Sequence, residues 1–106
     1  MAELLSGTLD LLILRVLNAG PLHGSGIGER IHVLSKEVLE VEEGSLYPAL
    51  YRMEAKGWIE AEWGQSERGR KAKIYSLTNA GRKQLERERL SWGKMKVAIG
   101  DILKNA

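Results

Sequence analysis

The chain has 106 residues, which is enough for one domain with one modest hydrophobic core. It contains no cysteine, which excludes disulfide and thiolate chemistry. No apolar run approaches the ~20 residues of a membrane-spanning helix and no secretion signal is present, so we expect a cytoplasmic protein. The net charge of +2 divides into −4 on residues 1–50 and +6 on residues 51–106. A basic half of this kind suits a surface that binds a polyanion.

Two helices are expected in the first third of the chain. Apolar residues recur at spacings of three and four in the first segment, at Leu9, Leu12, Ile13, Val16 and Leu17. The turn-forming run Asn18–Pro21 ends that helix. A shorter second helix is expected to begin near Gly24 or Ser25, with Ile27, Ile31 and Leu34 facing the core. A charged connection, Ser35–Glu42, follows it.

A third helix is expected from about Gly44 to Lys56. We predict Ser45 as its N-cap and Pro48 in its first turn, where proline is tolerated. Gly57 is placed to end it as a C′ glycine does. The predicted buried stripe is Leu46, Leu50 and Met53. The residues then left facing outward are Ser45, Tyr47, Pro48, Tyr51 and Arg52.

After this helix, apolar residues recur at every second position and no longer at helical spacing. Ile59, Ala61 and Trp63 alternate with glutamates, which predicts a half-buried strand with these three residues inward. A polar tip, Gly64–Arg70, leads to a return strand at Lys73–Leu77, with Tyr75 and Leu77 inward. Thr78 is expected to cap a final helix that runs nearly to the chain end. Three helices, one β-hairpin and a long helix predict a mainly α fold (α+β), the winged helix-turn-helix.

The final helix carries a heptad-like apolar stripe. Its members are Leu85, Trp92, Met95, Ile99 and Ile102, and Glu88 interrupts the pattern once. A helix projecting from a small domain can bury such a stripe against a second copy of the chain. It can also bury it against the first helix of its own chain, and both can hold. We therefore expect residues 1–78 to form the winged helix-turn-helix and residues 79–106 a homodimerisation helix.

Five motifs together are similar to the PadR family of transcriptional regulators. They are Leu9–Leu14, Gly20–Gly24, Glu43–Leu50, Lys56–Ile59 and Tyr75–Gly81, and the similarity runs from about residue 5 to about residue 103. The chain resembles the short subgroup with a single C-terminal helix. Ser25 stands where the family often has tyrosine. The resemblance implies a dimeric winged-helix protein, usually a repressor, and some members release DNA when an aromatic or lipophilic compound binds.

Two groups of residues are candidates for DNA binding. A helix that enters the major groove would present Ser45, Tyr47, Pro48, Tyr51 and Arg52 to bases and phosphates. The basic hairpin tip would follow the phosphate backbone or the minor groove with Arg68, Arg70, Lys71 and Lys73. The alternative for each group is a solvated surface. At the level of the whole protein, the alternative is a winged-helix module that binds proteins and not DNA.

An enzymatic function is not expected. The segment His23–Gly28 superficially resembles a phosphate-binding loop or a serine nucleophile turn, but both require a preceding strand, and here a helix is expected. His23 and His32 lack the partners of a metal site, so no metal or cofactor is predicted. Trp92 and its symmetry mate could bind a planar aromatic effector between them, or simply fill the dimer interface.

Overall fold

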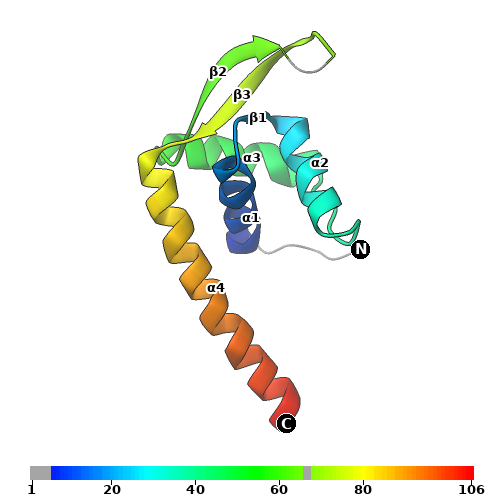
Figure 1. Ribbon diagram of the computed structural model, residues 1–106, viewed down its shortest axis with the longest axis vertical. Coiled ribbons are helices and arrows are strands. Elements are labelled where there is room, and N and C mark those ends of the chain that lie inside the picture. Colours follow the sequence, from blue (N-terminus) through cyan, green and yellow to red (C-terminus); the bar gives the residue numbers. More distant parts are fainter. Residues whose placement is uncertain (1–5, 66–67) are drawn as a thin grey trace.

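The computed structural model describes residues 6–65 and 68–106 and has the predicted α+β winged-helix architecture (Figure 1). Three helices are followed by a hairpin and a long helix, and the sheet has three strands rather than two. Ser66 and Glu67 of the predicted hairpin tip lie outside the described residues. The elements are α1 (Ser6–Asn18), β1 (Leu22–His23), α2 (Gly24–Leu34), α3 (Glu43–Ala55), β2 (Ile59–Gln65), β3 (Lys71–Leu77) and α4 (Asn79–Asn105).

The hydrophobic core lies around α1, which packs against α2, α3, α4 and β3. The predicted stripe of α3, Leu46, Leu50 and Met53, is buried, as are Ile27 and Ile31 of α2. Leu34 was predicted to face the core but is exposed. It belongs to the last turn of α2, where Val33 is exposed as well, so the core does not reach this end of the helix.

The three-stranded sheet is antiparallel, in the order β1-β3-β2. Strands β2 and β3 pair from Ile59 opposite Leu77 to Gln65 opposite Lys71. Strand β1 adds only two residues, with Leu22 opposite Tyr75, and is too short to show any period in the sequence. A strand therefore does precede Gly24, but it is an antiparallel edge strand and not the central parallel strand that a phosphate loop requires.

The distal ends of β2 and β3 extend beyond the helices (Figure 1). Tyr75 and Leu77, near the base of the hairpin, are buried as predicted. Trp63 was predicted to face inward, but 64% of it is exposed. Alternation along a strand identifies a face, but at the distal end of the hairpin this face opens onto a groove lined by α2 and α3 and does not pack in the core.

The two ends of α3 differ in how well local sequence signals predicted them. The prediction of Ser45 as the N-cap was wrong, because the helix begins at Glu43 with Glu42 as its N-cap and the Ser45 amide donates to the Glu42 carbonyl. Pro48 consequently lies in the second turn and cannot donate to the Gly44 carbonyl. The C-terminal prediction is confirmed: Gly57 has φ +77°, and its amide donates to the Glu54 carbonyl.

The start of α4 is fixed by Thr78, as predicted. Its Oγ1 accepts a hydrogen bond from the Gly81 amide at 3.0 Å and donates to the Trp58 carbonyl at 2.9 Å. The N-terminal part of α4 packs beside α1, and its C-terminal part projects from the domain (Figure 1). In the described part of the chain, no helix combines the length and apolar character needed to cross a membrane.

Candidate nucleic-acid interface

The exposed surface of α3 has an outer face and two flanks. Tyr51 lies on the outer face beside Pro48, and 78% of Tyr51 is exposed. Tyr47 and Arg52 are about 140° apart around the helix and therefore lie on opposite flanks. Ser45 is also exposed, on the same flank as Arg52. Four of the five predicted outward residues are thus exposed, while Arg52 is half-buried.

The Tyr47 flank of α3 packs on the N-terminus of α2. A Cβ atom added to Gly24 would lie 2.8 Å from Tyr47 Cε1 and 2.9 Å from its hydroxyl oxygen. Glycine at this position therefore makes room for the Tyr47 ring, because any side chain would displace it. Gly24 therefore has a packing role, because it lets the aromatic flank of α3 lie directly against α2.

The predicted basic tip lies across an open groove from this flank. The groove has a volume of about 590 Å³, and α2, α3 and the hairpin all line it. Tyr47 forms part of one wall, and the hairpin supplies Trp63 and the cationic side chains Arg68, Arg70, Lys71 and Lys73. The structure therefore brings one third-helix candidate, Tyr47, to the same groove as the four hairpin candidates, while Ser45, Pro48, Tyr51 and Arg52 lie outside its lining.

Trp63 belongs to this surface, although sequence reasoning assigned it to the core. The Lys71 ammonium lies 5.0 Å from the centre of the Trp63 ring, which is within the range of a cation–π contact. In the sequence, the position of Trp63 next to the basic tip could have indicated that it belongs to this surface, whereas the alternation of the strand could not. A flat, exposed indole among cations can pack against sugars or bases.

Lys73 differs from the other hairpin cations because it has partners within the chain. Its Nζ lies 3.5 Å from Glu54 Oε1 of α3 and 5.9 Å from the centre of the Tyr75 ring. Burial raises the pKa of the Tyr75 hydroxyl, an effect that the Lys73 charge opposes, so this phenol stays protonated at neutral pH. Lys73 therefore joins the hairpin to α3 as well as facing the groove.

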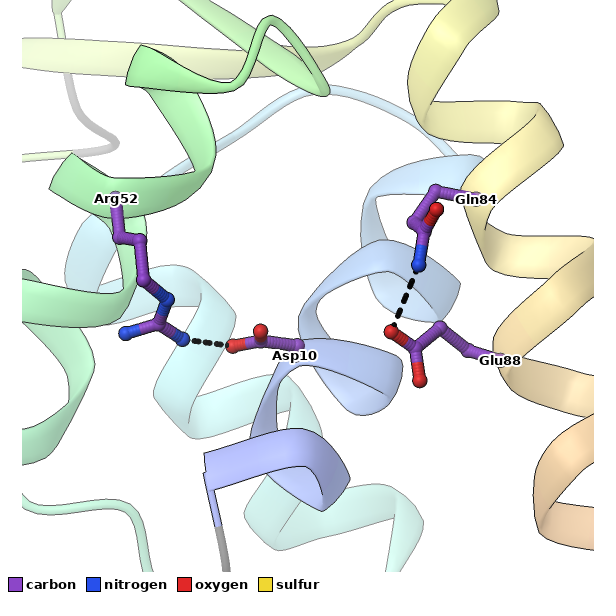
Figure 2. Close-up of polar contacts among 4 residues, drawn as sticks. All are labelled: Asp10, Arg52, Gln84 and Glu88. Carbon is purple, nitrogen blue, oxygen red and sulfur yellow. Dashed lines mark hydrogen bonds and ion pairs between the residues drawn. The ribbon is translucent and has the colours of Figure 1, made fainter.

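Arg52 is also engaged within the chain. Figure 2 shows its guanidinium pointing to the carboxylate of Asp10 on α1, and Arg52 Nη2 lies 2.5 Å from Asp10 Oδ1. The two residues are 42 positions apart in the sequence. The sequence analysis treated Arg52 as an outward residue and did not identify this pair.

Acidic side chains occupy the other edge of the α3 N-terminus. Glu29, Glu40, Glu42 and Glu43 line a groove of about 340 Å³ between α2 and the start of α3. Among the described residues, no group of three or more His, Cys, Asp and Glu side chains is placed to hold a metal ion. The acidic edge would repel phosphate, so the charge distribution favours a polyanion on the hairpin side.

The apolar stripe of α4 divides into two parts. Leu85 is only 8% exposed and packs in the core of its own chain, so this end of the stripe follows the intrachain interpretation. The remaining members, Trp92, Met95, Ile99 and Ile102, are exposed. Glu88, which interrupts the stripe, accepts a hydrogen bond from the Gln84 amide at 2.9 Å (Figure 2).

Comparison with known proteins places the chain among transcriptional regulators. Residues 13–87 match the model of the transcriptional regulator PadR-like family. The chain is 30% identical over 98 residues to an uncharacterized protein of Lysinibacillus sphaericus, covering 92% of this chain and 90% of that one. It is 33% identical over 89 residues to transcriptional regulator Rv3488 of Mycobacterium tuberculosis, covering 84% and 79%. A PadR-like transcriptional regulator from Bacillus cereus is 30% identical, with a TM-score of 0.81 and coverage of 99% and 100%.

Proposed function

We propose that this chain, a member of the PadR-like family of transcriptional regulators, is a homodimeric repressor that binds an inverted-repeat operator. Members of this family regulate transcription and are not enzymes. The observation that carries this proposal is the groove that the Tyr47 flank of α3 shares with the cationic hairpin, beside the exposed outer face of α3. A protein with this function would act in the cytoplasm, where the operator DNA lies.

On DNA, α3 would lie in the major groove and the hairpin on the adjacent backbone or minor groove. Tyr51 and Pro48 would face the bases, with Ser45 and Tyr47 at the groove walls. The hairpin cations Arg68, Arg70 and Lys71 would neutralise phosphates. Lys73 is already partnered by Glu54, so it would contribute less to this neutralisation.

The exposed stripe of α4 supports the dimer. Trp92, Met95, Ile99 and Ile102 would pack against the same residues of a second copy, which removes their apolar surface from water. A two-fold dimer presents two copies of α3, so its operator should be an inverted repeat. The half-site centres should lie about 10 base pairs apart, or a multiple of that distance.

A winged-helix module that binds only proteins is the competing function. Exposed cations on the hairpin and an aromatic outer face of α3 favour DNA. Salt dependence separates the two functions, because phosphate contacts release counterions and a protein interface of ordinary charge does not.

The proposed interface predicts different defects for α3 and hairpin variants. Tyr51→Ala should weaken operator binding about tenfold and leave binding to random DNA nearly unchanged, since a base contact discriminates by 1–3 kcal/mol, roughly. Lys71→Ala should weaken binding to both DNAs and reduce the salt slope by about one. Fluorescence anisotropy at several salt concentrations measures both quantities.

Lys104→Ala is the matched control for Lys71→Ala, because it removes the same charge from the far end of α4. It should leave both affinities unchanged. Equal losses of Tyr51→Ala on operator and random DNA would show that α3 does not read sequence.

Regulation by an aromatic compound extends the proposal. Trp92 is half-exposed and would meet its symmetry mate in the two-fold dimer, where two indoles could stack on a planar ligand. Titration of Trp92 fluorescence, with Trp92→Phe to identify its signal, tests this. A broad aromatic panel in which no compound both changes that signal and lowers operator affinity would exclude it.

A further inference from the structure

Asp10 is the one charged side chain in the core of the described residues. It is 7% exposed and lies on α1, among helices that contribute only apolar residues to the buried core. A carboxylate is stable in such surroundings only when a cation or hydrogen-bond donors satisfy it. Arg52 supplies the cation, with 40% of its own side chain still exposed.

The pair joins the two helices that matter most to the proposed function. Arg52 comes from a flank of α3, the helix proposed to read DNA, and Asp10 comes from α1 (Figure 2). Helix α1 also packs against α4, which carries the proposed dimer stripe. The Asp10–Arg52 ion pair therefore connects α3, the helix proposed to read DNA, to α1, which packs against α4.

The opposite flank of α3 is fixed in a different way. Tyr47 lies against Gly24, where a Cβ atom would come within 2.8 Å of its ring. Close packing on one flank and an ion pair on the other add to the buried stripe of α3 in holding the rotation of this helix about its own axis. That rotation decides where Tyr51, on the face between the flanks, meets the DNA.

We infer that Arg52 is a positioning residue, which holds α3 in register with α1 through Asp10 and does not read a base. This inference rests on the proposed function, because it assigns a role within operator recognition. The Arg52 guanidinium donates through Nη2 to this buried carboxylate, and the charge-assisted bond fixes the direction of the side chain. Releasing it to a base would leave the Asp10 charge buried without a cation.

The two roles of Arg52 predict opposite effects for Asp10→Asn. If Arg52 positions α3, removing the carboxylate charge should loosen α3 and weaken operator binding about tenfold, while random DNA binds as well as before or better. If Arg52 reads a base, the same substitution frees the guanidinium, and operator affinity should stay the same or rise. Asparagine has nearly the shape of aspartate, so the comparison isolates the charge.

A double-mutant cycle completes the test. Asp10→Asn, Arg52→Gln and the double variant are compared for binding to operator and random DNA, at a temperature where circular dichroism shows all of them folded. If Arg52 positions α3, the double variant should prefer operator over random DNA at least as strongly as the weaker of the two single variants does. The reason is that each single change already breaks the same ion pair. Additive losses, or an Asp10→Asn variant with undiminished preference, would overturn the inference.

Failure of the proposed function would look different. In that case the unmodified protein would itself show no preference for any operator over random DNA. The double variant Asp10→Asn with Arg52→Gln is a second route if Asp10→Asn alone does not fold, since it leaves neither charge of the pair without its partner. For that variant alone, positioning predicts that Tyr51→Ala has a smaller added effect than in the unmodified chain, and an unchanged Tyr51→Ala effect would contradict it.

Discussion

Replacing Ile99 and Ile102 together with aspartate should convert the proposed dimer into monomers. Both isoleucines lie in the exposed part of the α4 stripe, so each dimer would bring four carboxylates into its apolar interface. Unpaired buried charges are strongly unfavourable, and we expect dimerisation to weaken by at least about a hundredfold. Sedimentation at micromolar concentration should change from the dimer to the 11.8 kDa monomer. Operator binding should fall with it.

Lys94→Asp is the control for this double variant. Lys94 lies on the other side of α4 from the stripe, so the variant tests added negative charge without altering the proposed interface. It should remain a dimer. An unmodified chain that sediments as a stable monomer, or a double variant that stays dimeric, would show that this stripe does not hold two copies together.

Gly81→Ala should destabilise the fold more than any other glycine substitution in α4. An added Cβ atom would lie 2.0 Å from the Trp58 carbonyl oxygen and 2.6 Å from Leu77 Cδ1. The carbonyl cannot move away easily, because the Thr78 amide and hydroxyl both donate to it. We expect a loss of about 3 kcal/mol in unfolding free energy. The melting temperature followed by circular dichroism should fall by roughly 10–25 °C.

Gly93→Ala provides the comparison within the same helix. Beyond its chain neighbours and the nearby backbone of α4, no atom of the described residues lies within 4 Å of a Cβ added there, and the residue is in the helix interior. Alanine favours helix over glycine by about 1 kcal/mol, so this variant should be slightly more stable. If Gly81→Ala melted within about 3 °C of the unmodified protein, α4 would not start against Trp58 as described.

Local signals in the sequence were sufficient for most of the elements. The three-and-four spacing of apolar residues identified α1 and the buried stripe of α3. Gly57 marked a helix end through its positive φ, and Thr78 marked a helix start through its hydroxyl. The order of elements then restricted the fold, because few small folds place one hairpin after three helices. These features depend on residues only a few positions apart.

The missing features depend on contacts between distant parts of the chain. Strand β1 exists because β3 pairs with it, and two residues carry no pattern of their own. Periodicity assigned Arg52 to a flank of α3 but could not identify Asp10 as its partner. The same limit applies to Trp63, whose exposure depends on where the helices stop covering the hairpin. Side-chain partners at the candidate site therefore required the structure.

The central claim is that two copies of this chain together read one DNA sequence. Selection of bound fragments from the source genome by the unmodified protein tests it most directly. The account predicts enrichment of an inverted repeat whose half-site centres lie about 10 base pairs apart, or a multiple of that distance. A bound pool with no sequence in common, or one converging on a single unpaired half-site, would contradict it.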